Sequence, residues 1–142
     1  MNSKNNSNIV NNNIDIVQLF CYITFMKTIS VNPEILQLAE KSARDSDVLR
    51  SKMCAIALSK NGQILHKTCN VRIFGMKNKW TIHAEERVIA RFRYPIHCIV
   101  IYRLNGNQTS KPCSKCMALI REAQVRKIVY FNGQNWIQEK VA

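Results

Sequence analysis

The sequence lacks the long apolar run that a membrane span requires. Its most apolar segment lies between Asp15 and Lys27 and comprises only residues 16–26, whereas a spanning helix needs about 20 apolar residues. The segment also differs from a signal peptide, because a single lysine, Lys4, precedes it and no small-residue cleavage site follows. We therefore expect neither a membrane anchor nor a leader peptide.

Acidic residues are scarce. Nine Asp and Glu stand against 21 Lys and Arg, which gives a formal charge of +12 and favours a polyanionic partner or a phosphorylated small substrate. The sequence has no run of five or six like charges, so it lacks the basic arm typical of nucleic-acid tails. A polyanionic or phosphorylated partner and a merely solvated basic surface remain equally open.

The cysteines do not form a disulfide framework. There are six in 142 residues, and their spacing is irregular apart from one close pair. Three of them, Cys54, Cys69 and Cys98, stand among apolar or β-forming residues and are expected to be small buried hydrophobes. We expect a reducing, cytoplasmic compartment.

The length and the 46% hydrophobic content fit one domain. Residues 1–13 contain seven Asn and little to bury, which predicts disorder. The apolar residues 16–26 are either an extra element packed on the core or an extension of a domain that begins near Met26. We expect residues 1–25 to be an extension and residues 26–142 to form the domain.

The pattern along the domain alternates strands with helices. A helix is predicted from Asn32 as its cap and Pro33 at its first position. The Asn61–Gly62 pair between two β-like runs predicts a hairpin. The predicted elements, in order, are a helix in 32–47, strands at 52–59 and 63–70, a helix at 81–93 with Thr81 as its cap, a strand at 96–103, a helix at 113–124 and a strand at 127–131. Helices that alternate with strands favour parallel pairing, so we predict a three-layer α/β/α sandwich with a mixed, mostly parallel sheet.

The close cysteine pair lies in SKPCSKC, where Cys113 and Cys116 follow Pro112. Zinc needs four ligands, and a structural site would need a second close pair of Cys or His, which the sequence lacks. His83, at the start of a predicted helix, supplies a third ligand and leaves the fourth position open for catalysis. The positive ends of the two helices favour thiolates. Glu85, two residues after His83, is a candidate proton shuttle.

HAE (residues 83–85) followed by PCSKC (residues 112–116) resembles the zinc-dependent cytidine and deoxycytidylate deaminase superfamily, whose signature is H-x-E…P-C-x-x-C. The resemblance covers about residues 50–131. It implies zinc bound by His83, Cys113 and Cys116, Glu85 as proton shuttle, the backbone of Ala84 beside the base, and a homo-oligomer.

The resemblance also suggests substrate residues. Asn70 stands where these enzymes hold the sugar, but Arg72 replaces an expected Glu. An arginine cannot accept a hydrogen bond, although it can bind phosphate, so a phosphorylated substrate is expected. Phe74 and Trp80 are candidates for the pocket wall.

Two functions follow from these residues. The first is a zinc-dependent hydrolase that converts a cytosine nucleoside or nucleotide, such as cytidine, CMP or dCMP, to the uracil form with release of ammonia. The alternative is a base-editing deaminase that binds single-stranded RNA, DNA or tRNA. The lone histidines His66 and His97, on predicted strands, are expected to be structural residues.

Overall fold

The computed structural model describes residues 26–73, 80–91, 95–106 and 108–141. The predicted N-terminal extension and Phe74 lie outside these ranges. The described elements are β1 (Met26–Thr28), α2 (Pro33–Arg44), β2 (Met53–Leu58), β3 (Ile64–Cys69), β4 (Val71–Arg72), β5 (Thr81–Ile82), α3 (Ala84–Arg91), β6 (Cys98–Arg103), α4 (Ser114–Glu122), β7 (Lys127–Phe131) and β8 (Trp136–Lys140). None of the helices in this part of the chain is long and apolar enough to cross a membrane.

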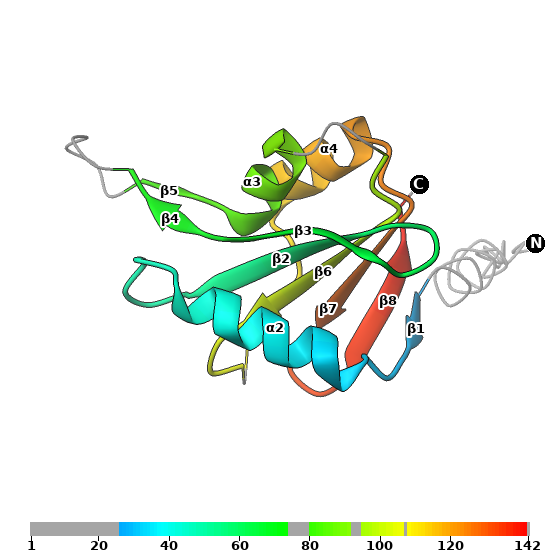
Figure 1. Cartoon of the computed structure of the whole chain (residues 1–142), viewed down its shortest axis with the longest axis horizontal. Helices are drawn as coiled ribbons and strands as arrows, with labels where there is room; N and C mark the ends of the chain where they lie inside the picture. Colours follow the sequence, from blue (N-terminus) through cyan, green and yellow to red (C-terminus); the bar gives the residue numbers. More distant parts are fainter. Residues whose placement is uncertain (1–25, 74–79, 92–94, 107, 142) are drawn as a thin grey trace, which may run out of the picture.

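Six strands form one sheet in the order β1-β8-β7-β6-β2-β3 (Figure 1). The mixed sheet is confirmed, but the expectation that it is mostly parallel is wrong, because β6 and β7 are the one parallel pair among the described strands. The β6–α4–β7 segment is a true parallel crossover. The chain segment through α3, however, places β6 antiparallel to β2, and β8 turns back beside β7.

The strand β8 is absent from the predicted elements although its signal is present. Asn132 and Gly133 separate the runs KIVYF and WIQEK, as Asn61 and Gly62 separate β2 from β3. Gly133 has a φ of 101°, which suits glycine. The Asn132 Oδ1 accepts hydrogen bonds from the N–H groups of Gln134 (2.9 Å) and Asn135 (2.8 Å). This Asn-Gly turn sends the chain back as an antiparallel strand.

Alternating side chains divide the core into two halves. Residues such as Ala55, Ile99 and Ile101 pack with α3 and α4 on one face, while Ile56 and Val100 pack with α2 on the other. Figure 1 shows α2 on one side of the sheet and α3 and α4 on the opposite side. Each fully buried aliphatic side chain contributes about 1.5–3 kcal/mol. The three-layer arrangement is confirmed.

The helix α3 begins later than predicted. Thr81 and Ile82 do not start the helix but pair with Arg72 and Val71 in a two-stranded ribbon of β4 and β5. The ribbon projects from the sheet beside α3 (Figure 1). Because the ribbon ends at Ile82, the next residue, His83, stands at the junction between strand and helix.

Candidate metal centre

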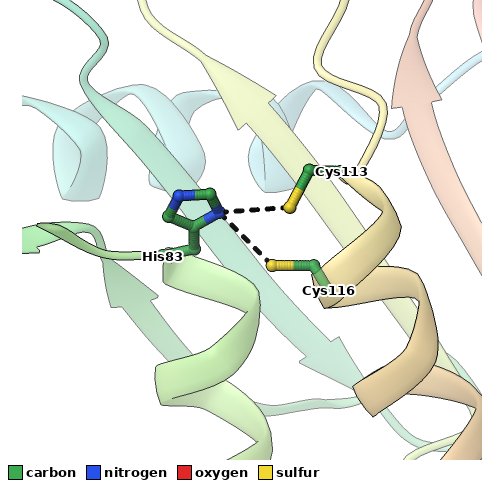
Figure 2. Close-up of side chains that lie close together, drawn as sticks. All are labelled: His83, Cys113 and Cys116. Atoms are coloured by element: carbon green, nitrogen blue, oxygen red, sulfur yellow. Dashed lines mark hydrogen bonds between the residues drawn. The ribbon is translucent and has the colours of Figure 1, made fainter.

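Three side chains meet where α3 and α4 begin. His83 directly precedes α3, while Cys113 and Cys116 lie at the start of α4. The His83 Nδ1 lies 3.6 Å from the Cys113 Sγ and 3.3 Å from the Cys116 Sγ (Figure 2). The Nδ1 and Sγ atoms of the three residues all lie within 4.8 Å of one another. The three predicted ligands are therefore brought together.

The spacing of these atoms suits zinc. Tetrahedral zinc, with Zn–S of about 2.3 Å and Zn–N of about 2.0–2.1 Å, holds a sulfur and a nitrogen about 3.6 Å apart. The two measured sulfur–nitrogen distances lie close to this value. Two thiolates and one imidazole are a donor set that zinc prefers, and three protein ligands leave a fourth position for a reacting molecule.

The backbone fixes two ligands as helix caps. The His83 carbonyl accepts the N–H of Arg87 (3.1 Å), and the Cys113 carbonyl accepts the N–H of Met117 (2.9 Å). Cys113 is the extended N-cap of α4, and Cys116 lies one helical turn later, so both sulfurs occupy one face. An ion pair of 3.4 Å between Lys115 and Glu86 links the first turns of the two helices.

Ser110 anchors the loop that carries the cysteines. It is fully buried, and its hydroxyl donates to the Ile101 carbonyl (2.8 Å) and accepts the N–H of Phe131 (2.8 Å). Its own N–H donates to the Phe131 carbonyl (2.8 Å). These bonds tie the loop to the ends of β6 and β7 three residues before Cys113. A serine in a polar loop has no distinctive sequence signal, so this role was not predicted.

Glu85 is a buried acid beside the metal ligands. Its side chain is 2% exposed, and its Oε2 has no hydrogen-bond partner among the described residues. Burial raises the pKa of its carboxyl more than its own backbone N–H and the nearby His83 lower it. Its helix start is held against the sheet, because the Thr68 hydroxyl donates to the Ala84 carbonyl (2.8 Å). A buried oxygen without a hydrogen bond costs free energy. Its presence therefore indicates a functional role for Glu85 rather than a role in packing.

The Cys116 thiol differs from the expectation based on the helix end. Burial, followed by the charge of Glu85, raises the pKa of Cys116 far above its ordinary value. The helix terminus alone therefore does not make Cys116 a thiolate, and a metal ion that binds there would displace its proton. Cys54 and Cys98 are buried as predicted, and burial raises the pKa of each to about 11. The prediction is wrong for Cys69, which is only half-buried. The five described cysteines are free of disulfides.

Asn70, the residue predicted to bind the sugar, forms hydrogen bonds within the protein. Asn70 is 5% exposed; its Oδ1 accepts the N–H of Met53 (2.9 Å) and lies 2.7 Å from the Ser46 hydroxyl, and its Nδ2 donates to the Ser51 carbonyl (2.6 Å). These bonds fix the start of β4 against β2. Its contact with substrate stays a prediction.

The ribbon carries the remaining predicted residues. Arg72 is exposed on β4, and its backbone N–H donates to Asp47 Oδ1 (2.7 Å). Trp80, which precedes β5, is 58% exposed, so its side chain faces outward rather than filling the core. The roles of both in substrate binding stay predictions.

Comparisons with known proteins agree with this geometry. A family model described as "Cytidine and deoxycytidylate deaminase zinc-binding region" matches residues 30–132. A dCMP deaminase from the cyanophage S-TIM5, solved in complex with dCMP and dUMP, is 26% identical with a TM-score of 0.50, over 70% of this chain and 82% of that chain. A comparison with curated proteins found no match.

A second solved structure supports the fold. Cytidine deaminase from Mycobacterium tuberculosis is 19% identical with a TM-score of 0.52, over 70% of this chain and 84% of that chain. The family match covers most of the chain, and it includes all three residues of the metal cluster. The chain belongs to the zinc-binding cytidine and deoxycytidylate deaminase family.

Proposed function

We propose that this protein hydrolyses the 4-amino group of a cytosine nucleotide or nucleoside, giving the uracil form and ammonia. The observation that carries the proposal is the buried Glu85 carboxyl, whose Oε2 has no hydrogen-bond partner in the described ranges, beside His83, Cys113 and Cys116. Zinc held by these three ligands lowers the pKa of water to about 7 and so supplies a nucleophile at neutral pH.

Glu85 moves the proton in this reaction. Water adds at C4 and the bond from C4 to the amino nitrogen breaks, so a proton has to pass from water to the departing nitrogen. A carboxyl whose pKa is raised by burial can accept that proton and then donate it. The backbone of Ala84, between His83 and Glu85, is proposed to border the base.

The proposed substrate is a monophosphate, CMP or dCMP, in preference to cytidine. Arg72 is exposed on the ribbon that leads into α3, where a guanidinium can bind phosphate through two parallel hydrogen bonds. The formal charge of +12 attracts such an anion. Similarity to a dCMP deaminase solved with dCMP and dUMP supports this choice. Asn70 is proposed to contact the sugar through the second N–H of its amide, since Ser51 takes the first.

Ammonia release tests the proposal. The panel comprises cytidine, CMP, dCMP, adenine and guanine nucleosides, and a single-stranded oligonucleotide that represents the editing alternative. A charged hydrogen bond contributes about 1.5–3 kcal/mol, so we expect kcat/KM to favour the monophosphate by roughly 10- to 150-fold. Arg72→Ala should remove most of this preference, whereas Arg121→Ala, an exposed cation at the end of α4, should keep it. Equal kcat/KM for cytidine and CMP in the unmodified protein would exclude a phosphate-binding Arg72.

We further propose that the protein is a homo-oligomer in a reducing, cytoplasmic compartment. Free thiols at the metal centre require reducing conditions. Size-exclusion chromatography with light scattering gives the mass of the protein in solution. A mass of 16.4 kDa, that of one chain, would contradict the oligomer.

A further inference from the structure

Five basic side chains gather at the end of the sheet away from the metal centre. They come from the β2–β3 turn, the start of β6, the start of β7 and the end of β8, and we call them the basic hollow: Lys60, His97, Arg126, Lys127 and Lys140. Together with Gln138 and Val141 they line a hollow of about 670 Å³. Figure 1 shows the start of β7 and the C-terminal end of the chain at this same edge.

The basic hollow continues into a second one. Lys60, His97 and Arg126 also line an adjoining hollow of about 870 Å³, whose wall includes the apolar side chains of Leu65 and Ile89. An elongated ligand therefore has room on both sides of these three residues.

No carboxylate of the described residues lines these hollows. Their lining residues in the described part of the chain include no Asp or Glu. The three ion pairs found in the described part of the chain lie elsewhere. Lys127 Nζ donates only to a neutral oxygen, Gln138 Oε1, at 3.4 Å. The cations of the basic hollow thus face one another and solvent.

Two further observations indicate crowding of positive charge. Burial, then Lys127, Lys60 and Arg126, lower the pKa of His97. Lys127 and Lys140 stand directly opposite each other across β7 and β8, and like charges in this position destabilise a sheet. The fold tolerates this repulsion, which a bound anion would remove.

The basic hollow is separate from the metal centre. His97 immediately precedes β6, and the loop after β6 leads to Cys113. Six residues of strand span about 20 Å, given a rise of about 3.3 Å per residue. The basic hollow and the loop that leads to Cys113 therefore lie at opposite ends of β6.

We propose that the basic hollow binds a chain of closely spaced phosphates. Several unpaired cations around an open hollow match several adjacent negative charges, whereas one carboxylate or one phosphate would leave most of them unpaired. A free oligophosphate and a single nucleic-acid strand both present this chemistry. The bound phosphates are a second ligand and not the molecule that is deaminated.

Direct binding tests the proposal without any measurement of deamination. The probes are inorganic tripolyphosphate, followed by calorimetry, and a fluorescent single-stranded oligonucleotide, followed by anisotropy, each at about 50 and 200 mM salt. The combined variant Lys60→Ala, Arg126→Ala, Lys140→Ala removes three exposed cations from the basic hollow. The matched control, Lys27→Ala, Lys41→Ala, Lys67→Ala, removes three exposed cations elsewhere.

The two variants should differ clearly. We expect the first to bind at least about tenfold more weakly and, for the oligonucleotide, to lose about 2 units of the slope of log affinity against log salt, at roughly 0.7 per phosphate contact. The control should keep most of the affinity. Binding of tripolyphosphate identifies a free oligophosphate as sufficient, and binding of the oligonucleotide alone identifies a nucleic-acid strand. The proposal fails if neither probe binds, or if the two variants lose affinity equally.

Discussion

The two ends of β6 carry opposite kinds of electrostatic imbalance. At the end that leads to Cys113, the buried Glu85 carboxyl has no hydrogen-bond partner for Oε2 among the described residues, and burial followed by the charge of Glu85 raises the pKa of the thiol Cys116. At the other end, three lysines and one arginine lie with His97 around a hollow that no acidic side chain of the described residues lines. The first end gathers groups that a cation can satisfy, and the second gathers groups that anions can satisfy.

Both ends of β6 carry groups that suit binding at a cost to the stability of the fold. Both arrangements oppose stability, since an unpaired buried acid and facing lysines each cost free energy. Between the two ends, the strand itself is ordinary core, with Ile99 and Ile101 fully buried. Residues that break the local rules of a stable fold are expected at functional sites. We therefore assign the one end to zinc and substrate and the other to phosphates.

The largest expected effect is at the metal end. Cys113→Ala removes one of three protein ligands, so the variant should lose its zinc, of which we expect about one per chain in the unmodified protein, and with it all measurable activity. Cys69→Ala, a half-buried cysteine outside the cluster, is the control and should keep the metal. Elemental analysis of both proteins gives the answer. Stoichiometric zinc in Cys113→Ala would remove the basis for the site.

A smaller effect is expected from the serine that anchors the cysteine loop. Ser110→Ala leaves the Ile101 carbonyl and the Phe131 N–H without their side-chain partner, which should lower the free energy of unfolding by about 1–3 kcal/mol. Zinc affinity should fall too, because the loop positions Cys113. Thr109→Ala, an exposed neighbour, is the control for urea unfolding. Equal stability of the two variants would mean that Ser110 anchors nothing.

The smallest effect is expected at the basic end. Lys140→Ala removes the charge opposite Lys127 and should raise the free energy of unfolding by a few tenths of a kcal/mol, with about 1 kcal/mol as the limit. The gain should vanish at about 1 M salt, where charges are screened within about 3 Å. Lys27→Ala, whose cross-strand partner is the neutral Gln138, should show no such salt dependence. Thermal melts of both variants at low and high salt measure this difference. A loss of stability in Lys140→Ala would contradict repulsion between Lys127 and Lys140.

The sequence predicted the metal cluster because its signal is local. Two half-motifs at helix starts identify His83, Cys113 and Cys116, and the structure brings the three together. Whether two strands pair in parallel or antiparallel is not determined by the local sequence. The alternation of strands with helices predicted mostly parallel pairs, but the direction of β6 relative to β2 depends on where the chain is inserted into the sheet.

Other features depend on contacts that composition does not encode. The ribbon of β4 and β5 shortens α3 because Thr81 pairs with Arg72 rather than capping a helix. The basic hollow collects residues from four segments between Lys60 and Lys140, so the sequence showed the net charge but not its location. The turn at Asn132 and Gly133, by contrast, had a recognisable signal.

Glu85 is proposed to transfer the proton at a zinc centre. Glu85→Gln preserves size and the buried position but removes the acid, whereas Glu86→Gln changes the neighbouring residue, which pairs with Lys115 on the surface. The decisive measurement is ammonia release from dCMP together with zinc content for both variants. We predict that Glu85→Gln retains zinc and loses at least about a hundredfold in kcat, while Glu86→Gln remains active. A zinc-loaded Glu85→Gln protein with undiminished turnover would contradict the account.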